Sequence, residues 1–159
     1  MKRKENQDDP WSGHYSFPGG KVGEREGFLE AAKRECLEEV GVNLSDEFLV
    51  GHCDDYFISQ KPNFVIRPFV YIIDKRSSLI NCKREVDQSF WWPLSGILEE
   101  SVCEHRSFET FIGEMRRPCL VYENHIIWGI TLSIFNNLLT KWQGQEILGN
   151  LLSPYELLP

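Results

Sequence analysis

The stretch Gly19–Val42, GGKVGEREGFLEAAKRECLEEVGV, contains the most regular pattern in this sequence. Its second half predicts a helix, because apolar residues recur there at steps of three and four positions and Gly41 follows as a stop signal. Glu35, Glu38 and Glu39 stand at positions i, i+3 and i+4 of that helix. We expect their carboxylates to share one face, opposite the apolar residues.

Carboxylates this close together repel one another, and each pair costs an isolated helix about 0.2–0.5 kcal/mol. A bound cation would offset that repulsion. Oxygen ligands of this kind suit Mg²⁺ or Mn²⁺. The residues alone also allow a simpler interpretation, which is a solvated acidic helix face after an ordinary turn.

The loop before this helix, Phe17–Gly20, ends in two consecutive glycines. Glycine leaves the backbone free for tight geometry and for close approach of a ligand. A loop that runs into a helix N-terminus is also a favourable place for phosphate oxygens. Gly19 and Gly20 are therefore candidate substrate-binding residues.

Together the loop and the helix resemble the Nudix box, the signature of the Nudix hydrolases. Its pattern is G-x5-E-x7-R-E-U-x-E-E-x-G-U, in which U is a bulky apolar residue. Cys36 is the one slightly unusual residue among those that fill the fixed positions. All nine positions of the pattern are filled, by Gly20, Glu26, Arg34, Glu35, Cys36, Glu38, Glu39, Gly41 and Val42.

This resemblance implies a metal-dependent hydrolase that cleaves a pyrophosphate joining a nucleoside to another group. It implies that Glu35, Glu38 and Glu39 bind the divalent metal ions, with the Gly20 carbonyl as a further candidate ligand. One glutamate, Glu39 or Glu38, would take a proton from the attacking water or orient it. Which of the two does so is left open by the sequence.

Two further residues of the box have supporting roles by the same resemblance. Arg34 would orient a glutamate and is counted with the catalytic residues, and Glu26 would support the arrangement. His14, which lies before the glycine loop, is a second candidate base. A lone histidine on a strand is more often structural, and we interpret His14 in that way.

The composition fits a single globular domain over residues 1–159, with 42% apolar and 13% aromatic residues. The net charge of −7 argues against a nucleic-acid-binding surface. No apolar run is long enough to span a membrane, and the charged N-terminus is unlike a signal peptide. We therefore expect a cytoplasmic protein. The five cysteines are odd in number and form no C-x-x-C pair, which predicts reduced thiols without zinc.

Residues 1–10, MKRKENQDDP, are polar and lack a strand pattern, so we expect a loop there. The resemblance implies a core strand before the box, and we expect that N-terminal strand to be missing. Residues 144–159 are expected to form a C-terminal extension with apolar anchors. The alternation of strands with two long helices predicts the fold class α/β, and the resemblance implies a Nudix-type α/β/α sandwich around a mixed β-sheet.

Downstream of the box, Asn63–Asp74 predicts one long strand, with a bulge or an edge at Pro68. Arg67 is a candidate phosphate ligand, because its guanidinium suits phosphate oxygens, or else it forms a salt bridge at the rim. The loops 54–62 and 101–118 are expected to select the substrate. From Ile127 onward an apolar stripe predicts a core helix.

Two stretches resemble the coenzyme A pyrophosphatase branch of the family. Residues 13–20 are close to G-x-V-x-F-P-G-G, and residues 127–131 are close to I-W-G-x-T. The upstream part of that branch's signature, L-L-T-x-R, is absent. The substrate implied is coenzyme A or a derivative, with a nucleoside diphosphate-sugar, ADP-ribose or a dinucleotide as alternatives. A nucleotide-sensing module without catalysis is the rival from another class, and a homodimer is expected from the frequency of dimers in the family.

Overall fold

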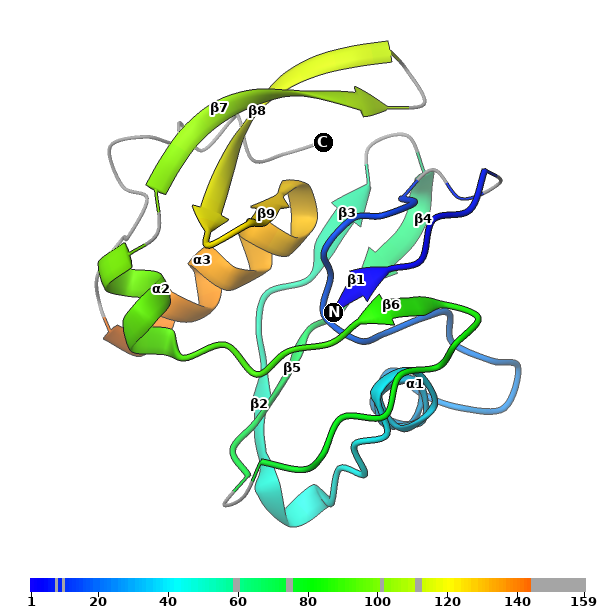
Figure 1. Ribbon diagram of the computed structural model, residues 1–159. Coiled ribbons are helices and arrows are strands. Elements are labelled where there is room, and N and C mark those ends of the chain that lie inside the picture. Colours follow the sequence, from blue (N-terminus) through cyan, green and yellow to red (C-terminus); the bar gives the residue numbers. More distant parts are fainter. Residues whose placement is uncertain are drawn as a thin grey trace. The chain divides into compact units, whose positions relative to one another are not determined.

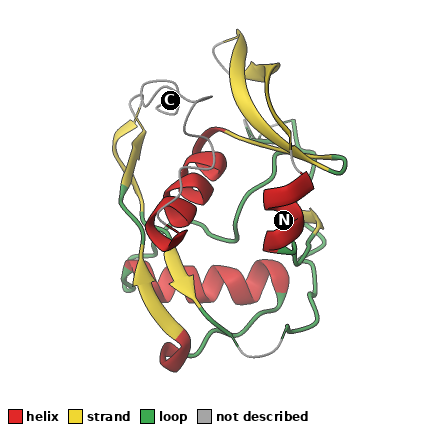
Figure 2. Cartoon of the chain, turned by 90° about the vertical axis from the view of Figure 1, so that its left-hand side faces the viewer, coloured by secondary structure: helices red, strands yellow, loops and turns green. Residues whose placement is uncertain are grey.

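The computed structural model describes residues 1–7, 9, 11–58, 61–73, 76–100, 102–110 and 113–143. The chain forms two compact units, Met1–Cys53 with Arg67–Trp91 and Asp54–Ile66 with Trp92–Pro159. Each unit combines helices and strands, which confirms the α/β class (Figure 1 and Figure 2). The described strands pair antiparallel, in three two-stranded sheets and one three-stranded sheet.

The N-terminal segment of the first unit contains a short strand, where we expected only a loop. Strand β1 (Lys2–Arg3) pairs antiparallel with β6 (Val86–Gln88), and Lys2 also forms a bridge with Tyr15. A strand of two residues is too short to show an alternating pattern. Its pairing depends on partners that lie elsewhere in the sequence, so local reasoning missed it.

Helix α1 (Phe28–Val40) confirms the helix expected in the box, and it ends where the sequence predicts. Gly41 has φ 73°, and its N–H donates to the Leu37 carbonyl at 3.0 Å. A Cβ at this position would lie 2.9 Å from Cβ of Ile80. Glycine is thus required here both by the left-handed backbone and by the close contact.

The prediction of one long strand over residues 63–74 is wrong, because the strand is interrupted at Arg67–Pro68. Strand β4 (Lys61–Ile66) belongs to the second unit, and β5 (Phe69–Tyr71) belongs to the first. Proline has no N–H for a sheet ladder, whereas the Pro68 carbonyl accepts from the Cys53 N–H at 2.8 Å. In the first unit β5 pairs with β2 (Leu49–His52), which follows a 3₁₀ turn at Asp46–Phe48.

The second unit is built around a three-stranded sheet and a long helix. Its first two strands, β3 (Tyr56–Ile58) and β4, pair with each other. Then follow α2 (Leu94–Glu100), the three strands of the sheet and α3 (Gly129–Gln143). The strands of the sheet are β7 (Val102–Thr110), β8 (Gly113–Tyr122) and β9 (His125–Trp128).

Two expectations for this unit are corrected by its sheet. We expected a loop over residues 101–118, but the described residues 102–110 and 113–118 belong to β7 and β8, which pair antiparallel. Charged side chains on both faces of this pair hide the alternation. The last helix begins at Gly129 rather than at Ile127, because Ile127 and Trp128 pair with β8 as part of β9. Gly129 has φ 59°, which turns the strand into the helix.

The core of the second unit lies between this sheet, α2 and α3. Its members are apolar side chains that approach from all three elements. The buried cluster consists of Ile97, Leu120, Tyr122, Ile127 and Leu132, with Trp92, Cys103 and Phe135 packed against it. The first unit buries Ala31, Val40, Val42, Cys53 and Val86. The expected C-terminal extension at 144–159 lies outside the described residues.

Candidate functional site

The candidate site is built on α1 and the loop before it, within the first unit, and Arg34 connects its acidic groups. The Arg34 guanidinium holds Glu26 through two hydrogen bonds, of 2.7 Å from Nη2 and 3.1 Å from Nε. Its Nη1 donates to Glu35 at 2.8 Å and to Glu38 at 3.2 Å. The Lys21 carbonyl accepts a further bond from Nη2 at 3.1 Å. One cation thus links three carboxylates of the box to the backbone directly after the glycine loop.

The pairing of Arg34 with Glu26 favours the charged form of both side chains. Hydrogen bonds from Arg34, and then from the Gly23 N–H, hold the pKa of Glu26 below its usual range. The Glu26 and Glu35 carboxylates in turn hold the pKa of Arg34 above its usual range. A bidentate pair also fixes the orientation of both partners. The pair with Glu26 thus holds the Arg34 guanidinium in the position from which Nη1 donates to Glu35 and Glu38.

We expected the carboxylates of Glu35, Glu38 and Glu39 to share a face of α1 opposite the apolar residues. Glu39 does not lie on such a face. Its side chain is buried, with 3% of the residue exposed. Its Oε2 accepts a hydrogen bond from the Gly19 N–H at 2.8 Å. Burial raises the pKa of Glu39 to about 7, with Glu35 adding to the shift and the Gly19 N–H opposing it. The helix turns by 100° per residue, so Glu39 falls toward the core side while Glu38 stays exposed.

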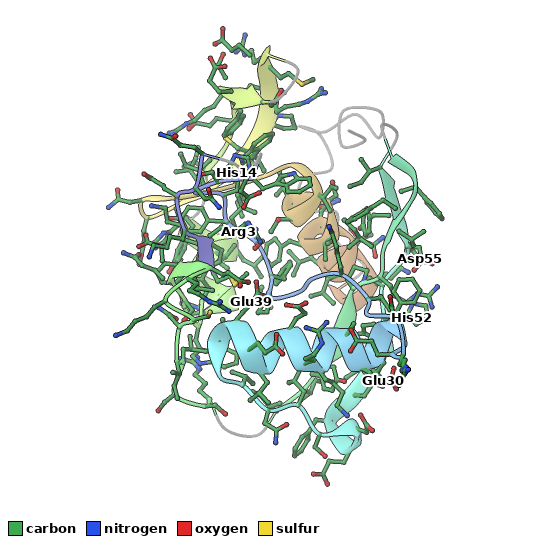
Figure 3. The ribbon with its side chains drawn as sticks, turned by 90° about the vertical axis from the view of Figure 1, so that its right-hand side faces the viewer. Arg3, His14, Glu30, Glu39, His52 and Asp55 are labelled. Atoms are coloured by element: carbon green, nitrogen blue, oxygen red, sulfur yellow. The ribbon has the colours of Figure 1, made fainter. Side chains whose placement is uncertain are left out.

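The N-terminal strand contributes a cation that the sequence did not reveal. Arg3 lowers the pKa of Glu39 through its charge, whereas Glu85 raises it. Figure 3 labels Arg3 and Glu39 in this unit. The Arg3 guanidinium itself holds Asp9, at 2.7 Å from Nη2 and 3.0 Å from Nε. No motif signals this role, because Arg3 lies in a polar segment whose pairing is non-local.

Gly20 lies in close contact with the Glu35 carboxylate. A Cβ added at Gly20 would lie 2.2 Å from Oε1 of Glu35. No other residue type fits that position without displacing the carboxylate. The contact brings the backbone of the glycine loop beside an acidic group of α1.

These residues fit a divalent cation in the chemistry of their donors, which are carboxylate oxygens with a backbone carbonyl nearby. The buried Glu39 carboxylate and the crowded Gly20 position support that fit. Within the described residues, however, no three acidic, histidine or cysteine side chains converge on one point. The carboxylates of Glu35 and Glu38 both accept hydrogen bonds from Arg34. Both would give up these bonds to bind a cation.

Arg67 lies at the other end of α1. Its guanidinium carbon is 4.9 Å from the ring centroid of Phe28, the first residue of the helix. This cation–π contact keeps a positive charge at the start of α1. His14 is half-buried, burial lowers its pKa, and its carbonyl accepts from the Arg3 N–H at 2.9 Å.

The sequence of this chain is similar to one family of known proteins. The family model described as NUDIX domain matches residues 1–109. A peroxisomal coenzyme A diphosphatase of Caenorhabditis elegans is 33% identical over 104 residues, which are 60% of this chain and 41% of that protein. An uncharacterised protein of Schizosaccharomyces pombe is 34% identical over 105 residues, 62% of this chain and 32% of that one.

A bacterial relative aligns over more of its own length. An uncharacterised Nudix hydrolase of Photorhabdus laumondii is 26% identical over 133 residues, 83% of this chain and 70% of that protein. By contrast, this chain spans only 32% of the length of the Schizosaccharomyces pombe protein and 41% of the coenzyme A diphosphatase. It spans 38% of a second Caenorhabditis elegans relative, Nudix hydrolase 3, to which it is 33% identical over 92 residues, 56% of this chain. No helix in the described part of the chain has the length and apolar character to cross a membrane.

Proposed function

Because this chain belongs to the Nudix family, we propose that it is a metal-dependent pyrophosphohydrolase. Its substrate would be a nucleoside diphosphate linked to another moiety. The observation that carries the proposal is the arrangement of charges on α1. Arg34 links three carboxylates of the box, and Glu39 is buried beside the glycine loop.

In this proposal Glu35, Glu38 and Glu39 hold the metal, with the Gly20 carbonyl as a further ligand. Mg²⁺ or Mn²⁺ bound there would neutralise charge on the pyrophosphate oxygens and make a water molecule more acidic. Side chains held by an existing network lose less conformational freedom when they bind. The bonds of Arg34 to Glu35 and Glu38 supply such a network before a cation takes the place of Arg34.

The remaining steps are assigned to groups of this chain. Glu39 or Glu38 would take a proton from the attacking water or orient it. Gly19 and Gly20 would allow the diphosphate to approach the backbone, and Arg67 would bind a phosphate oxygen of the substrate. Arg34 would act through the glutamates that it holds.

For the substrate we favour coenzyme A or a derivative. The name of the worm relative, a coenzyme A diphosphatase, supports this choice. The partial signatures at residues 13–20 and 127–131 support it as well. A nucleoside diphosphate-sugar, ADP-ribose or a dinucleotide is the alternative, and a nucleotide sensor that does not cleave is the rival class. The cytoplasmic location and the homodimer stay predictions.

A substrate panel tests this proposal. Coenzyme A, ADP-ribose, a nucleotide sugar and a dinucleoside polyphosphate are incubated with the chain in Mg²⁺, in Mn²⁺ and in a chelator, and product masses locate the cleaved bond. We expect coenzyme A to yield 3′,5′-ADP and 4′-phosphopantetheine at the highest kcat/KM, with no turnover in the chelator. A comparable or higher kcat/KM on the nucleotide sugar would select the alternative. Metal-dependent binding without any cleavage would select the sensor.

A further inference from the structure

The hairpin β7–β8 of the second unit places two arginines directly opposite each other. In its antiparallel register Arg106 on β7 faces Arg117 on β8. Side chains opposite each other in such a pair point to the same face, with Cβ atoms about 4.5–5.5 Å apart. Two guanidinium groups in these positions repel each other. The hairpin therefore keeps a charge arrangement that costs stability.

The chain neutralises this charge in part. Nε of Arg106 donates to Oε1 of Glu104, two residues earlier on the same strand. The Arg117 guanidinium donates to the sulfur of Met115 at 3.9 Å, and it forms no ion pair with a carboxylate of the described residues. Along the described hairpin, Glu104 is the carboxylate on this face, since Glu109 and Glu114 face each other on the opposite one. This face of the described hairpin thus carries two positive charges and one negative charge.

Aromatic rings lie on the same face of the sheet. Phe108 on β7 is paired with Met115, and Trp128 on β9 is paired with Cys119. These two partners on β8 lie two residues before and two residues after Arg117. The two rings stack with centroids 4.1 Å apart and an angle of 9° between their planes. Arg117 is half-buried. Apolar surface beside a cation lowers the local polarity and strengthens its attraction for an anion.

We propose that this face of the hairpin, with Arg106 and Arg117 beside the stacked rings, binds a phosphate group of a nucleotide. Guanidinium groups present paired N–H donors that match the oxygens of phosphate. A dianion between the two arginines offsets the repulsion that the register imposes. The choice of a nucleotide as the carrier rests on the proposed function, whereas the arginine site belongs to the second unit alone.

A single phosphate group fits this surface better than a nucleic acid does. The chain has a net charge of −7, which repels an extended polyanion. On the face of the two arginines, Glu104 lies two residues from Arg106 along β7. Phosphates that continued along β7 past Arg106 toward Glu104 would meet this carboxylate. The favourable charge is therefore confined to the region around Arg106 and Arg117.

Titration calorimetry without divalent metal tests the site directly. The probes are adenosine 3′,5′-bisphosphate, adenosine and inorganic phosphate, and the variants are Arg106→Met, Arg117→Met and Arg117→Lys. Arg116→Met is the matched control, since it removes the same charge from the opposite face, where Arg116 faces Ser107. We expect each methionine variant of the site to weaken bisphosphate binding by about tenfold or more, and the control to change it less than about twofold. Arg117→Lys keeps the charge without the planar fork and should fall between them.

The outcomes separate the sources of the phosphate and the competing explanations. A nucleotide ligand is supported if the bisphosphate binds more tightly than inorganic phosphate and if the site variants lose affinity for it. Equal affinity for the two probes overturns the choice of a nucleotide as the carrier of the phosphate group. An equal loss in Arg116→Met, no loss in any variant, or tighter binding of a single-stranded oligonucleotide overturns the proposal. Melting curves check that each variant folds, and Arg106→Lys repeats the test if a methionine variant does not. These titrations need no turnover, so an inactive chain with intact binding would count against the pyrophosphohydrolase proposal alone.

Discussion

Of the two long helices, α1 buries a charged side chain, and the described part of α3 does not. Helix α1 buries Glu39 together with Ala31 and Val40, whereas α3 buries Leu132 and Leu139. A buried carboxylate costs free energy, as the pKa of about 7 at Glu39 shows, while a buried leucine contributes to stability. The residues that α1 buries thus belong in part to the candidate site, whereas the leucines that α3 buries belong to the core. Substitutions in the two helices should therefore affect different properties.

The largest effect is expected from the acids of α1. Glu38→Gln and Glu39→Gln should each lower turnover by at least about two orders of magnitude, because each removes a proposed metal ligand or base. The melting temperature of Glu39→Gln without metal should stay the same or rise, since a neutral amide is cheaper to bury and can still accept from the Gly19 N–H. Steady-state kinetics at matched metal concentration and thermal melts measure both.

Glu30→Gln provides the control for these variants. Glu30 is exposed on the same helix, and the change removes the same charge. It should leave turnover within about twofold, as is usual for surface positions. Wild-type turnover in both Glu38→Gln and Glu39→Gln would rule out the mechanism based on this helix.

The backbone of the candidate site was predictable from the sequence, but the positions of its side chains were not. The spacing of the box predicts α1 and its end at Gly41, because helix periodicity and the glycine stop are local signals. The burial of Glu39 and the charge of Arg3 beside it depend on segments that fold back from elsewhere in the chain. A local pattern contains no information about such contacts.

The second prediction concerns α3. Leu132→Ala should lower the free energy of unfolding by about 2–5 kcal/mol, since Leu132 is 1% exposed inside the buried cluster and truncation leaves a cavity. Leu37→Ala makes the same change on α1, where the side chain is 50% exposed, and should cost well under about 1 kcal/mol. Urea denaturation measures both. Similar losses in the two variants would remove the distinction between the helices.

Beyond the box, the prediction of the fold failed where pairing and proline decide the structure. Pro68 divides one apolar run between two units, and only the partner strands reveal which half pairs with which. The hairpin of β7 and β8 was hidden because arginines and glutamates occupy both of its faces. Ile127 and Trp128 have the spacing of the helix that follows, yet pairing with β8 holds them in a strand.

The smallest effect tests the segment that supports the buried carboxylate of α1. Asp9 accepts two hydrogen bonds from Arg3 and one from the Trp11 N–H. Burial raises the pKa of Asp9, but these bonds and the charge of Arg3 outweigh it, so the pKa lies below its usual value. The stabilisation is then fully present above the unfolded-state pKa of about 3.9 and is lost as the pH falls through the lower folded-state pKa.

Asp9→Asn should therefore destabilise the chain at pH 7 by on the order of 1 kcal/mol, and the difference from the wild type should shrink toward zero at low pH. Urea denaturation of both proteins at a series of pH values from neutral to acidic measures this difference. The charge of Arg3 also acts on Glu39, so in the wild type Glu39 still compensates part of the charge of Arg3 when Asp9 is neutralised. If the two carboxylates share that cation, the loss should therefore be larger in the background of Glu39→Gln. A loss that is constant with pH would mean that Asp9 acts through packing rather than charge, and the N-terminal strand would then support Glu39 without an electrostatic contribution from this pair.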